Sequence, residues 1–205
     1  MRGDEVTPFQ AVFAVEHISE AFLLPVLAAM TDAFPFVIRN VHSDNGSEYI
    51  NHKVAKLLEK LRIEQTPSRS RQTNDNALAE SKNASTVRNY LGYSHIPPFF
   101  ASQVNTFTVE VLSPYLNFHR PCHFPTEYTD KKGKLRKRYR YQDRMTPYEK
   151  FRSLPAAEND LKPGTTFEKR DAIAAECSDN ETAQHLNEAR AKLFQSINKS
   201  QQSAA

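Results

Sequence analysis

The hydrophobic and polar positions of the first forty residues predict a strand, a helix and a second strand. The segment Phe9–Glu16 is rich in strand-forming residues. Ser19 suits a helix N-cap, and Glu20–Phe34 repeats apolar positions densely enough for a buried helix, which Pro25 is expected to kink or to shift at its start. Phe36–Ser43 then has the β-branched character of a second strand and stops at a polar turn.

The alternation of helices and strands continues through the next eighty residues. Apolar positions at helical spacing predict an amphipathic helix and comprise Val54, Leu57, Leu58 and Leu61. Ile63–Thr66 is a short strand candidate, followed by a polar and basic loop at 67–75. Asn76–Leu91 returns to helical composition and ends at Gly92, a residue type common at helix C-termini. Ala101–Leu116 is a further helix candidate.

The order of these elements favours an α/β fold with parallel strands. Right-handed crossover connections place the carboxyl ends of such strands at one edge of the sheet, where ligands commonly bind. Asp44 follows the second predicted strand directly, so we expect it at that edge.

The chain beyond residue 120 predicts a smaller appended unit. Asp130–Lys134 has the composition of a β-hairpin turn. A polar helix is predicted from about Thr182 to Ile197, with an apolar stripe of Ala183, Leu186, Ala189, Leu193 and Ile197. We therefore divide the chain into a core at 1–120, a basic hairpin-like segment at 121–162 and a polar helical tail at 163–205.

Composition excludes several classes of protein. With 39% hydrophobic and 25% charged residues among 205, the chain can bury a core. Its two cysteines, Cys122 and Cys177, are too few for a disulfide scaffold or a four-cysteine zinc module. The longest apolar run, around Ala21–Met30, is too short to cross a bilayer, and the N-terminus lacks a signal-peptide pattern. We expect a soluble cytoplasmic protein without a membrane partner.

The net charge of +3 comes from one segment of the chain. Residues 1–120 carry 11 Lys and Arg against 12 Asp and Glu, residues 151–205 carry 7 against 8, and residues 121–150 carry 9 against 4. Seven of the ten residues 131–140 are cationic, including Lys137 and Arg138. Such a run indicates a phosphate-rich partner; the alternative is a solvated surface loop.

The main candidates for chemistry are two carboxylates, Asp44 at a strand end and Glu80 near the start of a later helix. Hard divalent cations prefer charged oxygen ligands, and two-metal phosphoryl transfer needs several carboxylates that converge on one phosphate. The alternative is structural: Asp44 caps its turn, and Glu80 favourably faces a helix N-terminus.

Two segments resemble the second and third acidic motifs of integrase-type transposases of the DDE class. They are His42–Tyr49 (HSDNGSEY) and Asn74–Asn83 (NDNALAESKN), with 35 residues between Asp44 and Glu80. That spacing is typical of the retroviral-like integrase catalytic core and of bacterial insertion-sequence transposases. The resemblance covers roughly residues 4–120, and Thr146–Glu149 resembles the region after that core. It implies a ribonuclease H-like mixed sheet flanked by helices, and metal-dependent DNA strand transfer.

The resemblance also implies roles for individual residues. Asp44 and Glu80 would ligate Mg²⁺ or Mn²⁺, and Lys82 and Arg88 would approach DNA phosphates. Arg69 and Arg71, in the loop before the Glu80 helix, are further candidates for gripping DNA; the alternative is a solvated loop.

The sequence departs from the family at its beginning. The family's fold starts with three antiparallel strands, the first of which carries an acidic ligand, whereas one strand candidate precedes the first helix here. Asp4 fits the turn before that strand better than the missing ligand position. We therefore expect an N-terminally truncated core, inactive or weak alone. The alternative is a non-catalytic DNA-binding remnant of the same fold. Unpaired strand edges would favour a homo-oligomer.

Three further features are candidates for binding or chemistry. Tyr139 and Tyr141 interleave with the basic run and suit either stacking on bases or cross-strand packing. His42, two residues before Asp44, is a structural histidine or a neighbour of the metal. Cys122 beside His123 is half of a metal site without a second pair, so we do not expect zinc.

Overall fold

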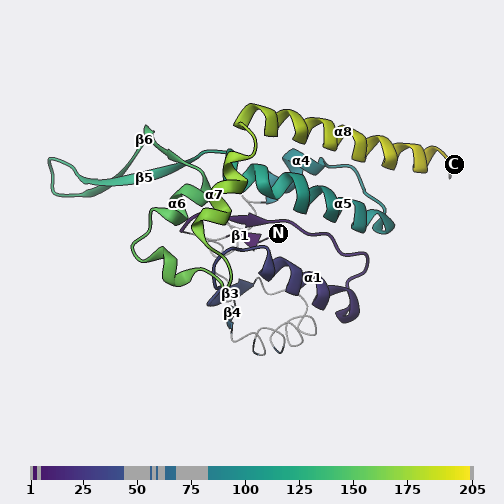
Figure 1. Cartoon of the computed structure of the whole chain (residues 1–205), viewed down its shortest axis with the longest axis horizontal. Coiled ribbons are helices and arrows are strands. Elements are labelled where there is room, and N and C mark those ends of the chain that lie inside the picture. The colour runs from purple at the N-terminus through teal and green to yellow at the C-terminus, as the bar shows by residue number, and fades with distance from the viewer. Residues whose placement is uncertain are drawn as a thin grey trace.

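The computed structural model describes residues 2–3, 6–43, 56, 59, 63–67 and 83–203. These residues form pairs of strands and several helices (Figure 1). The described strands pair as β1 (Arg2–Gly3) with β2 (Gln10–Ala11), β3 (Asn40–Ser43) with β4 (Glu64–Pro67), and β5 (Cys122–Thr129) with β6 (Leu135–Met145). The described helices are α1 (Glu20–Asp32), α4 (Asn89–Leu91), α5 (Ala101–Phe107), α6 (Pro147–Arg152), α7 (Phe167–Ala175) and α8 (Asp179–Ser203). Short π-helical segments are η1 (Asn83–Arg88), η3 (Thr108–Leu112) and η4 (Tyr115–His119), and 3₁₀ segments are η2 (Pro98–Phe100) and η5 (Ala157–Asp160).

The fold is α/β, as predicted, but its strands are shorter than the sequence pattern indicates. The predicted strand Phe9–Glu16 is wrong in length, since β2 covers only Gln10–Ala11 and pairs antiparallel with β1. The backbone of Ala14 binds the side chain of Asn105 instead of a strand, with N···Oδ1 and Nδ2···O distances of 2.6 and 3.0 Å. The side-chain amide of Asn105 thus takes the place of a neighbouring strand at Ala14.

The second predicted strand is also shorter. Only Asn40–Ser43 pairs with β4, in parallel, and the pairing runs from Asn40 opposite Glu64 to Ser43 opposite Pro67. The preceding residues turn to another part of the chain, since Phe36 bridges Leu161 and the backbone N–H of Val37 donates to Asp160 O over 2.8 Å. The predicted strand Ile63–Thr66 appears one residue later as β4.

Before residue 120, the helical segments that the structure describes follow the pattern, whereas the predicted helix 54–61 and the first part of Asn76–Leu91 lie largely outside the described residues. α1 starts after Ser19 as predicted, contains Pro25, and ends two residues before Phe34. Gly92, at φ +76°, ends α4 in a conformation that glycine adopts without strain. The segment 98–119 is helical throughout and includes the predicted helix Ala101–Leu116, with π-helical turns in η3 and η4.

The helix α8 covers a hydrophobic core with the apolar stripe that the sequence predicts. It spans 25 residues, more than the predicted 182–197, and lies along α4 and α5 in Figure 1. Its apolar stripe buries Leu186, Leu193 and Ile197. They join a cluster with Leu91, Phe100, Val104, Phe107, Val111, Leu112 and Leu116. None of the described helices is both long and apolar enough to cross a membrane.

An aromatic cluster connects the N-terminal segment to α6. Phe9 contacts Phe34 and Phe36, both with ring centroids 5.6 Å away. Phe36 in turn lies 4.9 Å from Phe151 of α6. The other α6 ring, Tyr148, contacts Phe118 of η4 at 5.0 Å. The helix that follows β6 is therefore fixed to the core by two buried rings.

Candidate nucleic-acid interface

The predicted site residues divide into two groups. Five lie outside the described residues and comprise Asp44, Glu80, Lys82, Arg69 and Arg71. Asp4 lies outside them too. The three that are described are Arg88, at the end of η1, and Lys137 and Arg138, on β6. The described part of the candidate site therefore consists of the edge of β3–β4, Arg88 and the β5–β6 hairpin.

The parallel pair β3–β4 brings two carboxyl ends of strands to one edge. Ser43, the last residue of β3, pairs with Pro67, the last residue of β4. Asp44 is the next residue in the sequence after Ser43. Among the described residues, no group of three or more His, Cys, Asp or Glu side chains is arranged to hold a metal ion.

Arg88 lies on the solvent side of a helical segment whose other side is buried. Two residues earlier, the fully buried Thr86 donates from Oγ1 to Gln10 Oε1 over 2.6 Å. The exposed guanidinium of Arg88 lies 5.6 Å from the ring centroid of Tyr93. A cation on an exposed aromatic face remains accessible to phosphate, so Arg88 is available for the predicted contact.

The β5–β6 hairpin has a turn built around Asp130, as the sequence predicts. The Asp130 backbone N–H donates to Lys134 O, and the Gly133 N–H donates to Asp130 O, both over 2.9 Å. Gly133 takes φ +73°, which suits a type I turn followed by a bulge. The Asp130 carboxylate accepts from the N–H groups of Lys132 and Lys134 at 2.8 and 3.0 Å, and from Arg136 Nε at 2.7 Å.

These bonds change the acidity of Asp130. The hydrogen bond from Arg136, followed by that from the Lys134 backbone, holds the pKa of the Asp130 carboxyl below its ordinary value of 3.8. Asp130 is therefore ionised at neutral pH, and its charge is compensated within the turn. Because Asp130 is already bonded to Arg136 and the turn backbone, the neighbouring lysine side chains stay free to bind an external anion.

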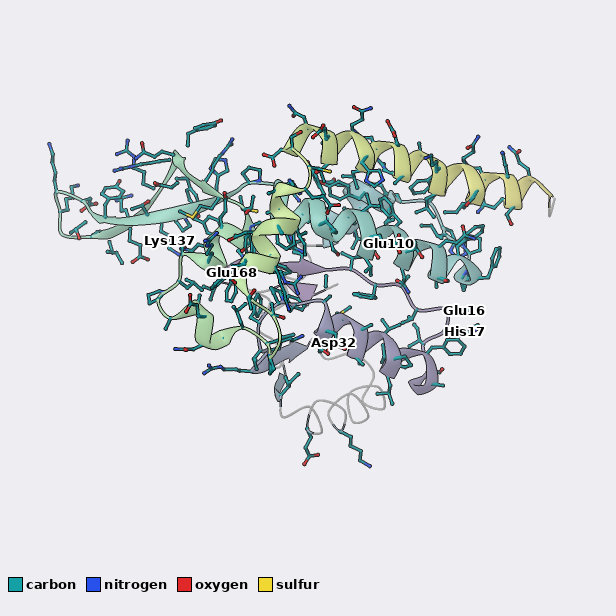
Figure 2. The ribbon with its side chains drawn as sticks, in the orientation of Figure 1. Glu16, His17, Asp32, Glu110, Lys137 and Glu168 are labelled. Carbon is teal, nitrogen blue, oxygen red and sulfur yellow. The ribbon has the colours of Figure 1, made fainter. Side chains whose placement is uncertain are left out.

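Cations outnumber carboxylates along the hairpin. Residues 122–145 hold eight Lys and Arg against three Asp and Glu, a difference of five. Arg136 forms an ion pair with Asp130. In the part of the chain that the structure describes, six others make no ion pair with a carboxylate: Lys131, Lys132, Lys134, Lys137, Arg138 and Arg140. Figure 2 shows Lys137 on the arm of the hairpin, away from the helices.

An irregularity near the base of the hairpin involves the eighth cation, Arg144. Pairing passes from Pro125–Tyr139 to His123–Arg144, which is two residues along β5 against five along β6. Arg144 Nε donates to His123 Nε2 over 2.9 Å, and its guanidinium lies 4.7 Å from the centroid of the Tyr141 ring. The extra residues of β6 bulge here and change the direction of the strand.

The hairpin leads directly into α6, which is well anchored. Thr146 and Glu149 form a reciprocal capping box, with Thr146 N to Glu149 Oε2 at 2.7 Å and Glu149 N to Thr146 Oγ1 at 3.1 Å. Lys150 Nζ lies 5.3 Å from the centroid of the Phe124 ring on β5. A solvent-exposed arm thus begins at a rigid base.

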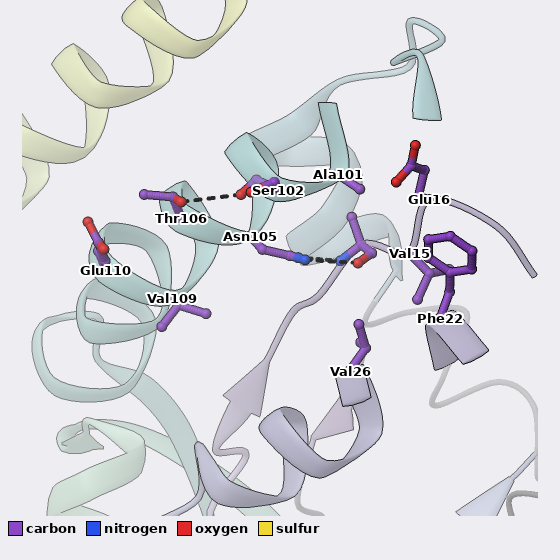
Figure 3. Close-up of a pocket in the computed structure, with 11 residues that line it drawn as sticks. Val15, Glu16, Phe22, Val26, Ala101, Ser102, Asn105, Thr106, Val109 and Glu110 are labelled. Atoms are coloured by element: carbon purple, nitrogen blue, oxygen red, sulfur yellow. Dashed lines mark hydrogen bonds between the residues drawn. The ribbon is translucent and has the colours of Figure 1, made fainter. Parts of the chain in front are cut away.

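A separate groove lies between α1 and α5 and was not predicted from the sequence. It has a volume of about 460 Å³. Val15, Phe22, Val26 and Val109 give it apolar walls, and Glu16 and Glu110 lie at its two ends (Figure 3). Asn105 borders the groove, and its side-chain amide is hydrogen-bonded to the backbone of Ala14.

The comparisons with known proteins leave the family open. No protein-family model matches the chain, and no solved structure matches it. Over 117 residues the chain is 32% identical to the uncharacterized protein y4rM of Sinorhizobium fredii (strain NBRC 101917 / NGR234). That match covers 56% of this chain and 33% of the relative, so the chain matches about a third of that protein's length.

Proposed function

We propose that the chain is the catalytic-core portion of a DDE-type DNA strand transferase, with Asp44 and Glu80 as ligands of Mg²⁺ or Mn²⁺. The observation that supports it best is the parallel pair β3–β4, because Asp44 directly follows the carboxyl end of β3 in the sequence. Ligands of open α/β sheets bind at that edge. The finer fold, a ribonuclease H-like mixed sheet, is part of this proposal.

The order of the described elements is compatible with it. The helix α1 precedes β3, Lys56 and Glu59 are helical between β3 and β4, and the helical segment 83–91 follows β4. This is the succession that the resemblance implies around its second and third acidic motifs. The proposal assigns two acidic ligands, and two carboxylates align a pair of metal ions less well than three, so we expect weak strand transfer.

Strand transfer on a labelled DNA duplex with Mg²⁺ or Mn²⁺ tests the proposal. We expect weak, metal-dependent joining that Asp44→Asn and Glu80→Gln both abolish. Glu59→Gln, an exposed helical carboxylate removed in the same way, is the matched control and should keep the activity. Joining that survives Asp44→Asn would overturn the assignment of this ligand.

The second candidate is a DNA-binding protein of the same fold without chemistry. The observation that favours it is the exposed hairpin with six cations that have no carboxylate partner in the described part of the chain. Salt-sensitive binding to DNA without metal-dependent joining is the result that selects this candidate. Self-association, expected from unpaired strand edges, stays a prediction.

A further inference from the structure

The β5–β6 hairpin is exposed on both of its faces. Every residue from 131 to 142 is exposed, and Figure 1 shows the hairpin extending away from the helices. A two-stranded hairpin that is covered on neither face is marginally stable in water. An arm of this kind gains stability from a partner that covers both faces.

Each face of the hairpin carries a cation that makes no ion pair with a carboxylate in the described part of the chain. Side chains alternate between the faces along a strand, and directly paired residues share a face. Arg138 pairs with Thr126 on one face, with Arg136 two residues away. Lys137 pairs with Glu127 on the opposite face. The tip between the strands adds three more cations, Lys131, Lys132 and Lys134, which we call the tip lysines.

The positions of these cations, on both faces and at the tip, indicate the shape of the anionic partner. A flat surface, such as a membrane, contacts one face of a ribbon and leaves the cations of the other face in solvent. A groove with phosphates along both walls contacts both faces and receives the tip. The charges on the two faces and the tip therefore favour a groove.

The thickness of the ribbon then indicates which nucleic-acid groove it fits. A strand ribbon with its side chains is about 10 Å thick, judging from the spacing of packed sheets. The major groove of B-form DNA is about 12 Å wide and admits a two-stranded ribbon, whereas the minor groove is about 6 Å wide. The major groove of A-form RNA is deep and too narrow for side chains to read.

We infer that the β5–β6 hairpin enters the major groove of double-stranded DNA tip first, with Lys137 and Arg138 facing opposite phosphate walls. The tip lysines then approach the floor of the groove, and Asp130 stays engaged with Arg136 and the turn backbone. Tyr139 and Tyr141, 60% and 81% exposed, lie further from the tip and supply apolar surface at the mouth of the groove. This inference shares its partner, DNA, with the proposed function, but it does not depend on the metal ligands.

Binding of the full chain to three probes of one sequence tests the inference: a DNA duplex, the single DNA strand and an RNA duplex. Fluorescence anisotropy over a salt series should show duplex DNA bound at least tenfold more tightly than the others. Lys137→Gln and Arg138→Gln should each weaken binding and each lower the slope of log affinity against log salt by about one. Lys192→Gln, an exposed lysine on α8, is the matched control and should change neither.

Protection of guanine N7 from dimethyl sulfate reports the groove directly, since N7 lies in the major groove. The wild-type chain should protect N7 at its site, and the double variant Lys137→Gln/Arg138→Gln should lose that protection. Equal affinity for the single strand, or tighter binding to phosphatidylserine vesicles, would overturn the inference. DNA binding that ignores both hairpin variants would also overturn it while leaving the proposed function intact. Circular dichroism of each variant checks that it remains folded.

Discussion

The side-chain amide of Asn117 pairs with both backbone groups of Gln10, in the manner of a neighbouring β-strand. The Gln10 N–H donates to Asn117 Oδ1, and Asn117 Nδ2 donates to Gln10 O, both over 2.8 Å. Both residues are buried, and 107 positions separate them in the sequence. The Gln10 side chain completes the network by accepting from Thr86. One strand segment is thereby joined to η1 and η4.

Asn117→Leu tests the strength of this pairing. The substitution keeps a side chain of similar size but leaves the backbone N–H and C=O of Gln10 without partners in the core. Because buried unpaired polar groups are costly, we expect the free energy of unfolding to fall by roughly 2–4 kcal/mol. Urea unfolding followed by circular dichroism measures it. Asn187→Leu, at an exposed position of α8, is the control and should change stability by no more than about 0.5 kcal/mol.

This network explains why the sequence predicts β2 imperfectly. The pattern of Phe9–Glu16 is that of a strand, and its backbone is indeed partnered, but at Gln10 and Ala14 by asparagine side chains. Periodicity reports which residues are buried, whereas the identity of a distant partner depends on tertiary packing. For Ala14 the available signal was Asn105, inside the predicted helix Ala101–Leu116, since Asn is unfavourable in helix interiors unless its side chain has a role.

Local features were predicted more accurately than distant ones. The N-cap at Ser19, the end of α4 at Gly92 and the Asp130 turn each depend on a few adjacent residues. The bridge between Phe36 and Leu161 joins residues far apart in the sequence, and no local pattern indicates it. Of the candidate site, the exposed cationic hairpin was predictable from charge and turn composition. The roles of Asp44 and Glu80 stay predictions.

Leu186→Ala tests whether α8 stabilises the core. Leu186 is 3% exposed and belongs to the same cluster as Leu112 and Leu116. Truncation leaves a cavity and removes buried apolar surface, so we expect a loss of about 2–5 kcal/mol in the free energy of unfolding. Lys192→Ala, on the exposed side of the same helix, should have little effect. A Leu186→Ala loss as small as that of the control would show that α8 packs loosely on the rest of the chain.

Asp130→Ala tests the organisation of the hairpin tip. The substitution removes the acceptor for two backbone N–H groups and for Arg136, so cross-strand nuclear Overhauser effects between Tyr128 and Arg136 should weaken. Lowering the pH should weaken the same nuclear Overhauser effects. The folded pKa of Asp130 lies below its ordinary value of 3.8, so the carboxylate supports the turn above that pH and loses this role as the pH falls through the folded pKa. Asp143→Ala, which removes the acceptor of the Thr126 hydroxyl on the arm but no hydrogen bond of the tip, provides the comparison and should leave these effects unchanged.

Tyr148→Phe should make the protein less sensitive to alkaline pH. The Tyr148 hydroxyl lies 2.6 Å from Asp171 Oδ1, and burial, followed by this hydrogen bond, raises the pKa of the phenol above its ordinary value of 10.0. The folded chain therefore keeps this proton at a pH where the unfolded chain releases it. The stabilisation is complete below pH 10 and is lost as the pH rises towards the folded pKa. At neutral pH the variant should lose about 1–2 kcal/mol, because Asp171 loses a donor.

Urea unfolding at pH 8 and pH 10.5 separates the two contributions of Tyr148. Wild type should lose stability between these pH values by more than Tyr148→Phe does, because the variant has no phenol to ionise at this position. Tyr93→Phe removes a tyrosine hydroxyl at an 85% exposed position and controls for the substitution itself. Equal losses in wild type and Tyr148→Phe would mean that the bond to Asp171 does not hold the proton. Among the contacts of Tyr148, its ring against Phe118 would then contribute more to the anchoring of α6 than its hydroxyl does.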